Sequence, residues 1–314
     1  MRNFADIVDH AMKNPQFVGL RPVVEKELLH YEILFALERE GLLEDLTFQG
    51  GTSLRLCRNA QRFSEDLDFV GGHDFAPAQL RKIRTCVERH IGKRYDLEIA
   101  VKEPREMRED PTYFGVKTDR WQIAVVTNPG RPDLPRQKIK FEVANVPAYT
   151  RETMSPMRNY EILPDGYDDI LVPTETLEEI MADKVVSLTA CTTYKRHRDI
   201  WDLGWLSQRL QREGDIDHDL VASLVDRKIQ DYQIEDFEGL LSDRIATLGE
   251  TVRSKSFLDE MTRFITPAAR KRTFDADAGL FLSQLDRTVG RILKVARTNL
   301  YAKDVRPDME FDMG

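Results

Sequence analysis

The sequence has few of the features that mark secreted, membrane-bound or zinc-binding proteins. Its 314 residues include only three cysteines, Cys57, Cys86 and Cys191. An odd number of isolated thiols without Cys-x-x-Cys spacing excludes a disulfide framework and a cysteine zinc site, so we expect buried or partly buried free thiols. The sequence shows no apolar run of about 18 residues and no charged and then apolar leader. We therefore expect a cytoplasmic protein.

Several common catalytic motifs are missing as well. No lysine follows the pair Gly50-Gly51 at the offset that a Walker phosphate loop requires. The Gly-x-Ser-x-Gly elbow of serine hydrolases does not occur. The six histidines lack the His-x-x-x-His and His-Glu-x-x-His spacings of metal sites. We expect each of them at the surface: His10, His30, His73, His90, His197 and His218.

Positive charge is scarce, since the formal net charge is −8. This balance argues against a protein that coats nucleic acid indiscriminately, because such binding depends on a summed positive field. Three local clusters of basic residues could still contact phosphates, although runs of charge usually lie on solvated helix ends and loops. These clusters occupy residues 81–84, 194–198 and 270–272.

Hydrophobic periodicity predicts an α+β protein with two domains. Helical spacing of apolar residues predicts helices at 22–43, 77–92, 177–188, 198–210, 218–224, 237–248 and 280–298. Alternation of apolar and polar residues predicts strands at 46–49, 95–101, 121–127 and 139–146. Proline and glycine cluster between residues 155 and 173, and there we divide an N-terminal domain, 1–160, from a helical domain, 161–314. The polar, acidic tail at 301–314 is expected to be loosely ordered.

Two glycines separate the first strand from the helix that follows it. Gly50 and Gly51 come after the strand at 46–49, and Thr52 and Ser53 open the helix. A tight turn into a helix N-terminus places backbone N–H groups and the positive end of the helix dipole at one point. The segment is therefore suited to holding an anion.

Acidic residues follow on the next predicted strand. Asp66 and Asp68 are two residues apart, so their side chains point to the same face while Leu67 and Phe69 point to the other. Like charges that close repel each other unless a cation lies between them, and Mg²⁺ prefers such oxygen ligands. Glu142 lies on another predicted strand among apolar residues. Together the three carboxylates could hold one or two Mg²⁺ or Mn²⁺ ions.

The combined pattern resembles a known superfamily. Gly51-Thr52, a spacer over residues 53–65, and Asp66-Leu67-Asp68 are similar to the glycine turn and paired aspartates of polymerase beta nucleotidyltransferases. The segments GGTSL, RFSEDLDF, KIKFE, VPTETLEEIMADKVVSL and RHRDIWDL follow the order seen in the AbiEii-like nucleotidyltransferase toxins, which include the MenT enzymes. Glu25-Lys26-Glu27 resembles a segment upstream of the turn in these proteins, with Glu27 in place of the commoner aspartate. The resemblance covers residues 22–206.

This resemblance implies an N-terminal polymerase-beta-type domain, a helical domain that completes the active site and binds the acceptor, and transfer of a nucleoside monophosphate from an NTP. The implied metal ligands are Asp66, Asp68 and Glu142, and the implied partners are an RNA acceptor such as the tRNA 3′ end and a cognate antitoxin. Donor binding is expected from the glycine turn and from the polar residues around it: Gly50, Gly51, Thr52, Ser53, Arg62 and Ser64. Glu65 has no assigned role, and we expect it to be solvated.

A lysine in the second domain also matches the family. Lys184 lies within the apolar stripe of the helix at 177–188, where a lysine either extends its head to water or serves a function. A turn at 191–197 would return Asp199 to the ammonium group. The family resemblance implies that Lys184 neutralises the donor triphosphate and that Asp199 orients it, with Asp202 as the alternative partner.

Three functions remain open from the sequence. The first is an RNA nucleotidyltransferase acting as the toxin of a toxin-antitoxin or phage-defence module, with Lys195, Arg196, Arg198 and residues 270–272 as candidate RNA contacts. The second transfers the nucleotide to a protein hydroxyl, on an antitoxin or on the enzyme itself. The third is a transferase scaffold that has lost its activity and only binds a partner.

Overall fold

The computed structural model describes residues 3–109, 115–131, 133, 135–163, 166–167 and 169–301. The chain divides into two compact units. Unit 1 comprises Met1–Thr176 and Leu258–Ala278, and unit 2 comprises Leu177–Phe257 and Gly279–Gly314. None of the described helices is long and apolar enough to cross a membrane.

Unit 1 is built around a mixed sheet, with the strand order β3-β4-β5-β2-β1-β7-β6. Two neighbouring pairs, β2 with β5 and β1 with β7, are parallel, and the other pairs are antiparallel. The strands are β1 (Thr47–Gln49), β2 (Leu67–Val70), β3 (Ile99–Lys102), β4 (Thr118–Val125), β5 (Gln137–Ala144), β6 (Glu152–Met154) and β7 (Val172–Thr174). The α+β class predicted from the sequence is therefore confirmed.

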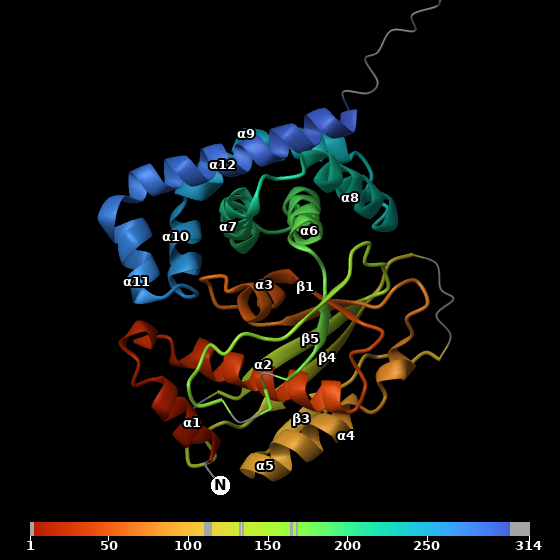
Figure 1. The fold of residues 1–314 in the computed structure, drawn as a ribbon, viewed down its shortest axis with the longest axis vertical. Helices are drawn as coiled ribbons and strands as arrows, with labels where there is room; N and C mark the ends of the chain where they lie inside the picture. The colour runs from red at the N-terminus through yellow and green to blue at the C-terminus, as the bar shows by residue number, and fades with distance from the viewer. Residues whose placement is uncertain are drawn as a thin grey trace, which may run out of the picture. The chain divides into compact units, whose positions relative to one another are not determined.

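Helices pack on this sheet, and α2 lies across one face of it (Figure 1). The aromatic residues Phe48, Phe69, Phe141 and Trp121 form the buried layer of that sheet, as the alternation around Leu67 and Phe69 predicted. The helices of unit 1 that precede the boundary are α1 (Phe4–Ala11), η1 (Pro15–Phe17), α2 (Arg21–Arg39), α3 (Gly50–Arg58), η2 (Pro77–Leu80), α4 (Ile83–Val87), η3 (Glu88–Gly92) and α5 (Lys93–Tyr95).

Unit 2 is helical, and its central helix α6 packs against α7, α8 and α9 (Figure 1). Its helices are α6 (Leu177–Ala190), α7 (His197–Glu213), α8 (His218–Asp231) and α9 (Phe237–Arg253). The unit boundaries then fall inside α10 (Lys255–Thr262) and α12 (Ala276–Tyr301), and between these lie α11 (Pro267–Arg270) and η4 (Lys271–Asp275). The backbone of α12 is kinked at Asp277, which has non-helical dihedral angles.

Three details differ from the pattern read in the sequence. The single helix predicted at 77–92 is a series of short 3₁₀, α and π segments, although the buried residues Leu80, Ile83, Val87 and Ile91 keep helical spacing. The stretch between residues 248 and 280, to which the sequence analysis assigned no element, contains α10 and α11. The division between the two units lies at Thr176 rather than residue 160, since β7 pairs with β1 and extends the sheet of unit 1.

The segment Leu258–Ala278 is separated from the rest of unit 1 by more than eighty residues of chain yet belongs to it. The backbone N–H of Phe63 donates to the carbonyl of Phe264 at 2.7 Å, and Arg62 forms an isolated β-bridge with Ile265. The returning segment thus fixes the loop that leads from α3 to β2. The tail beyond residue 301, predicted to be loosely ordered, lies outside the described residues.

Candidate active site

The glycine pair lies at the junction of β1 and α3, where two side chains from the β2 region approach the backbone. Gly50 has φ +74°, and a Cβ atom there would lie 2.9 Å from Oδ2 of Asp68. At Gly51 a Cβ would lie 2.3 Å from Nη2 of Arg62 and 3.0 Å from Oγ of Ser64. Glycine is required at both positions, at the first also by the left-handed backbone. The turn, Arg62, Ser64 and Asp68 therefore form one constellation, as the sequence predicted.

The first turn of α3 contributes two buried hydroxyl groups. Thr52 donates its hydroxyl hydrogen to the carbonyl oxygen of Asp66, which ties the helix start to the acidic segment. Ser53 has no exposed surface, and its Oγ has no hydrogen-bond partner among the described residues. A buried hydroxyl without a partner is costly. Such a group beside a helix N-terminus fits contact with a bound anion.

The carboxylates lie in a polar row on the face of the sheet opposite the aromatic layer. Backbone register places Asp68 beside Gln49 on β1 and beside Glu142 on β5, and Glu142 beside Arg120 on β4. Residues opposite one another in a sheet present their side chains to the same face. The register thus brings Asp68 and Glu142 onto neighbouring strands. Asp66 directly precedes β2 rather than lying within it.

Two cations that the sequence analysis did not single out accompany these carboxylates. Lys140 Nζ lies 3.3 Å from Oδ2 of Asp66, and Arg120 forms an ion pair with Glu142. Lys140 is two residues before Glu142 on β5, so the strand alternation around KIKFE already places both on one face. The position of Arg120 depends on the β4–β5 register, which is not visible in the sequence.

The donor set suits a divalent cation of the Mg²⁺ type. In the described part of the chain no group of three or more His, Cys, Asp or Glu residues is close enough to hold a metal ion. Mg²⁺ does not require such a cage, because one or two carboxylates with water and substrate phosphates are its usual ligands. Asp66 and Asp68 fit that requirement, and residue 50, being glycine, has no side chain that would press against the carboxylate of Asp68. Glu142 would have to leave Arg120 to serve as a third ligand.

Two side chains of helix α2 contact Glu65, which lies between Ser64 and Asp66. His30 is completely buried, its Nε2 lies 3.1 Å from the carbonyl oxygen of Glu65, and burial lowers the pKa of His30 to about 4. The neutral imidazole therefore donates this hydrogen bond. Lys26 Nζ pairs with Glu65 at 2.8 Å. The prediction that Glu65 is merely solvated is wrong, because it anchors the loop to α2.

Other histidines also depart from the expectation. His30 and His197 are buried, not at the surface, because each packs into helix contacts that the isolated sequence does not show.

The cysteines follow the prediction: all three are free, with Cys57 and Cys86 buried and Cys191 partly exposed.

Glu27 also acts on the glycine turn, through a buried ion pair. Its carboxylate accepts hydrogen bonds from Nε of Arg55 at 2.8 Å and from Nη2 of Arg55 at 3.1 Å. Asn159 donates a further bond to Glu27 at 3.0 Å. Because Arg55 lies on α3, this pair fixes the helix that follows the turn to α2. The Glu25-Lys26-Glu27 segment is thus a support for the site, and Arg55 is a residue that the sequence analysis missed.

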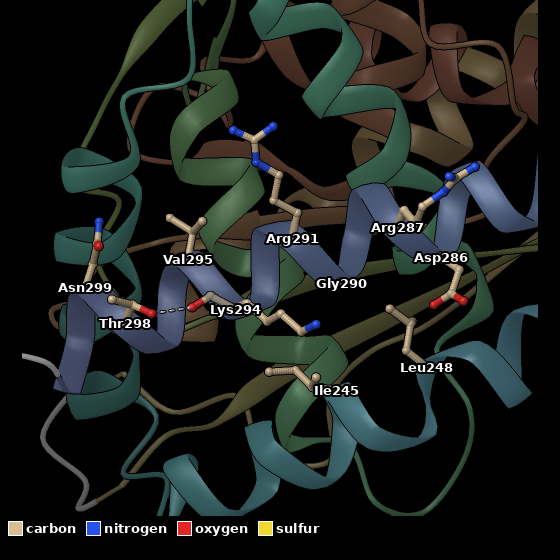
Figure 2. Close-up of a pocket in the computed structure, with 10 residues that line it drawn as sticks. All are labelled: Ile245, Leu248, Asp286, Arg287, Gly290, Arg291, Lys294, Val295, Thr298 and Asn299. Carbon is tan, nitrogen blue, oxygen red and sulfur yellow. Dashed lines mark hydrogen bonds between the residues drawn. The ribbon is translucent and has the colours of Figure 1, made fainter.

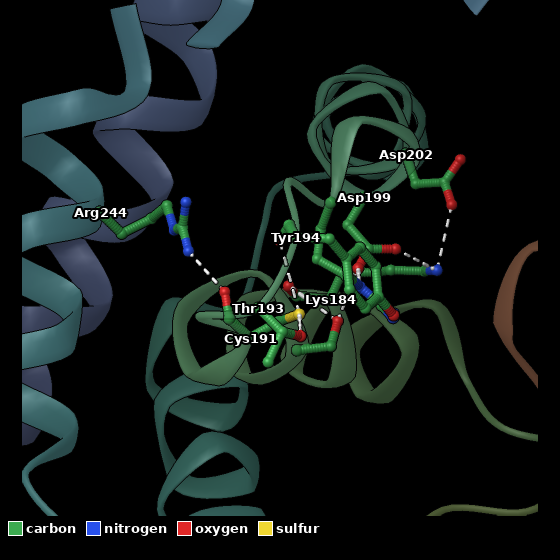
Figure 3. Close-up of polar contacts among 9 residues, drawn as sticks. Lys184, Cys191, Thr193, Tyr194, Asp199, Asp202 and Arg244 are labelled. Carbon is green, nitrogen blue, oxygen red and sulfur yellow. Dashed lines mark hydrogen bonds and ion pairs between the residues drawn. The ribbon is translucent and has the colours of Figure 1, made fainter. Parts of the chain in front are cut away.

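The lysine singled out in unit 2 lies among buried carboxylates (Figure 3). Lys184 Nζ lies 2.7 Å from Oδ1 of Asp199 and 3.2 Å from Oδ2 of Asp202. The other oxygen of Asp199 accepts bonds from Ser187 at 2.8 Å and Arg196 at 2.5 Å. The predicted proximity of Lys184 and Asp199 is confirmed. Lys184 is 7% exposed, Asp199 3% and Asp202 2%.

The charges around Asp199 determine its protonation. Burial by itself would raise the pKa of Asp199, but the positive charges of Lys184 and Arg196 outweigh it and hold that pKa well below its usual range. The carboxylate is therefore ionised at every physiological pH. Ser187 was not predicted as its partner, because that contact depends on the packing of α6 against α7. Arg196 lies only three residues before Asp199, so its contact is local along the chain, although it was not predicted either.

In the three basic clusters, four arginines are paired with acids within their own unit. Lys195 is exposed, and Arg198 is partly buried in the first turn of α7. Arg196 also donates to the hydroxyl of Tyr194 at 2.9 Å. The other pairs are Arg81 with Glu109, Arg84 with Glu103, Arg196 with Asp199 and Arg270 with Asp275.

Comparison with known proteins gives a consistent result. The family model described as nucleotidyl transferase AbiEii toxin, type IV toxin-antitoxin system, matches residues 32–279. The solved structure of MenT4, a nucleotidyltransferase toxin from Mycobacterium tuberculosis H37Rv, superposes with a TM-score of 0.51 at 21% identity, covering 96% of this chain and 99% of that one. Two Helicobacter pylori structures, a putative nucleotidyltransferase and JHP933, each give a TM-score of 0.45 at 18% identity. They cover 90% and 89% of this chain, and 99% and 95% of their own. No curated protein matches the chain.

Proposed function

Because the chain belongs to the AbiEii family of nucleotidyltransferase toxins from type IV toxin-antitoxin systems, we propose that it transfers a nucleoside monophosphate from an NTP to an RNA hydroxyl, at the 3′ end of tRNA. The observation that carries this proposal is the packing of the glycine turn against Asp68, Arg62 and Ser64. Such a constellation supplies a cradle for phosphates beside carboxylates that can hold cations.

The residues of the cradle have separable tasks. Backbone N–H groups at the start of α3 and the hydroxyl of Ser53 bind donor phosphate oxygens, and Arg62 and Ser64 extend that contact beyond Gly51. In-line attack on the α-phosphate needs positioning and charge neutralisation more than covalent help from the protein. The cradle therefore orients the donor, and the hydroxyl of the acceptor displaces pyrophosphate.

Asp66 and Asp68 would hold Mg²⁺ or Mn²⁺, and Glu142 is the third proposed ligand. When bound, such a cation neutralises phosphate charge and lowers the pKa of an attacking hydroxyl. Without a bound metal, Lys140 pairs with Asp66 and Arg120 pairs with Glu142. The proposal requires these two ion pairs to open, so that the carboxylates can bind the metal.

Lys184 and Asp199 retain the roles that the family resemblance implies. Lys184 would neutralise the donor triphosphate, and Asp199 would orient its ammonium group through their 2.7 Å contact. Asp202 also contacts that ammonium group, at the longer distance of 3.2 Å, and is the alternative residue for the orienting role. The cognate antitoxin is expected to be the second gene product of the module.

The test is incubation of the protein with Mg²⁺, each labelled NTP in turn, and total tRNA. We expect label on the RNA with at least one NTP and none with Asp66→Asn or Asp68→Asn. Binding of Mn²⁺, followed by electron paramagnetic resonance, should weaken in the same two variants, which tests the metal ligands without relying on activity. Label on the protein instead of the RNA would support the protein acceptor, and no label with any NTP would exclude the proposed activity.

A further inference from the structure

A groove in unit 2 presents cations that no acidic side chain among the described residues neutralises. It lies between α9 and α12 and has a volume of about 520 Å³ (Figure 2). Three cations line it, Arg287, Arg291 and Lys294, all on α12 and all exposed. Spacings of four and three residues place them on one face of the helix, over about 10 Å of its length.

These three cations differ from the paired arginines of the basic clusters described above, because none of the three has an ion pair with a described acid. Nε of Arg287 donates to the carbonyl oxygen of Ser283 at 3.2 Å, an intrahelical bond that leaves its charge uncompensated. The charged side chains of Arg291 and Lys294 have no hydrogen bond or ion pair with any described residue. The acid in the lining, Asp286, is already paired with Arg253 at 2.9 Å. The groove therefore carries net positive charge on a chain whose total is −8.

The neutral polar side chains that line the groove already have hydrogen-bond partners within the protein. Thr298 donates its hydroxyl to the carbonyl oxygen of Lys294 at 3.0 Å, and Asn299 donates to Asp219 at 3.1 Å. The floor between the helices consists of Ile245, Leu248 and Val295, together with Gly290. An occupant is thus held by charge rather than by a pattern of donors and acceptors, which is how proteins contact a phosphate backbone irrespective of sequence.

We propose that the α9–α12 groove binds the phosphate backbone of the acceptor RNA through Arg287, Arg291 and Lys294. This inference rests on the proposed function, because it names a binding surface for the acceptor. It also moves the main RNA contact from the predicted residues 194–198 and 270–272, in which Arg196 and Arg270 are paired with carboxylates, to α12, for which the sequence predicted no role.

The test is the affinity for bulk tRNA, measured by fluorescence anisotropy without NTP so that no transfer occurs. The groove variant carries Arg287→Gln, Arg291→Gln and Lys294→Gln. Each lost phosphate contact lowers the slope of log K against log salt by about 0.7–0.9. We expect binding weakened by at least about tenfold and the slope lowered by about 2 to 3. In transfer assays the KM for tRNA should rise while the KM for NTP stays unchanged.

The matched control removes the same charge from unit 2 outside the groove. Arg209→Gln, Arg212→Gln and Arg297→Gln change three exposed arginines, of which Arg209 pairs with Glu213 and Arg297 with Glu238. This variant should bind tRNA within about twofold of the wild type, because its arginines lie outside the groove. Equal weakening of the two variants would overturn the proposal, since it would show an effect of net charge alone.

A second variant separates RNA from a protein partner. At Gly290 an added Cβ meets only Leu248, at 3.7 Å, so Gly290→Leu fills the floor and leaves the three cations in place. Phosphate contacts at the rim should survive, and tRNA affinity should stay within about twofold. The contrary outcome has two parts. The affinity for tRNA is the same in the wild type, the groove variant and Gly290→Leu, and an amphipathic helical peptide with one leucine face and one glutamate face binds the wild type but not Gly290→Leu. In that case the groove is a protein-binding site and the proposal fails.

The two proposals can fail separately. A wild type that labels tRNA, with a groove variant that binds tRNA equally well, would overturn the groove assignment and leave the transferase activity standing. A wild type that neither binds nor labels tRNA would overturn both.

Discussion

At the scale of single residues, the candidate active site depends on two side chains that are absent. The space where Gly51 would carry a Cβ is filled by the guanidinium group of Arg62, at 2.3 Å, and by the hydroxyl of Ser64, at 3.0 Å. Gly50 meets Asp68 in the same way. A close approach of backbone and charged side chains concentrates N–H donors and a cation beside a carboxylate, and only glycine permits it.

We therefore expect Gly51→Ala to reduce transfer by at least about tenfold. The methyl group displaces the end of the Arg62 side chain, and a long side chain can make such a movement at small cost to stability. The free energy of unfolding should therefore change by less than about 1 kcal/mol. Initial rates and urea denaturation measure the two effects. Gly130→Ala is the control, because nothing lies within 4 Å of a Cβ there, and it should keep full activity. Full activity in Gly51→Ala would remove Arg62 from the donor site.

At the scale of secondary-structure elements, α6 and α7 are joined by charges rather than by apolar contact alone. Lys184 on α6 meets Asp199 and Asp202 on α7, and all three are buried. Opposite charges taken out of water repay their desolvation only while both partners are present. The sequence predicted that Lys184 and Asp199 meet, and the depth at which they are buried means that the pair also contributes to stability.

Lys184→Ala should accordingly lower the free energy of unfolding by about 3 to 5 kcal/mol, because it removes the cation that lies between the buried carboxylates of Asp199 and Asp202 and leaves Arg196 as the cation beside Asp199. Lys195→Ala, at an exposed position nearby, should change it by less than about 0.5 kcal/mol. The pKa of Asp199 is depressed in the folded state, so its contribution is present above about pH 4 and is lost as the pH falls toward the folded value. The difference between wild type and Lys184→Ala should therefore narrow below about pH 4. A pH-independent difference in urea unfolding would contradict the pairing.

At the scale of the whole molecule, unit 1 is assembled from two distant stretches of chain. Phe264, in the returning segment, is 2% exposed and belongs to the same apolar core as α2 and the sheet. Its carbonyl accepts the bond from Phe63 that holds the loop before β2. Unit 1 is therefore incomplete without residues that follow most of the helical unit.

Phe264→Ala should destabilise the protein by about 3 to 5 kcal/mol, as expected for a large buried aromatic side chain. Because the same segment supports the loop carrying Arg62 and Ser64, the affinity for NTP should fall as well. Calorimetry and titration with NTP check the two expectations. Val18→Ala, at a position that is 63% exposed, should alter neither. An unchanged thermal midpoint in Phe264→Ala would show that the segment is dispensable.

The sequence alone determined the local parts of the site. Alternation around Leu67 and Phe69 fixed the strand and its buried face, and the glycine pair fixed the turn, because both patterns act through neighbours in the chain. The order of these motifs identified the family. The helices of unit 2 were also predicted, since their apolar spacing repeats over several turns.

Apart from the contact between Lys184 and Asp199, which the sequence predicted, tertiary structure decided which charges meet across elements. Arg120 reaches Glu142 through the register of β4 and β5, and Arg55 reaches Glu27 across two helices. No local pattern encodes such contacts, because they depend on the packing of segments far apart in the chain. The same holds for the α9–α12 groove: Arg291 and Lys294 look like the other basic residues in the sequence, and only the fold shows that no described acid lies against them.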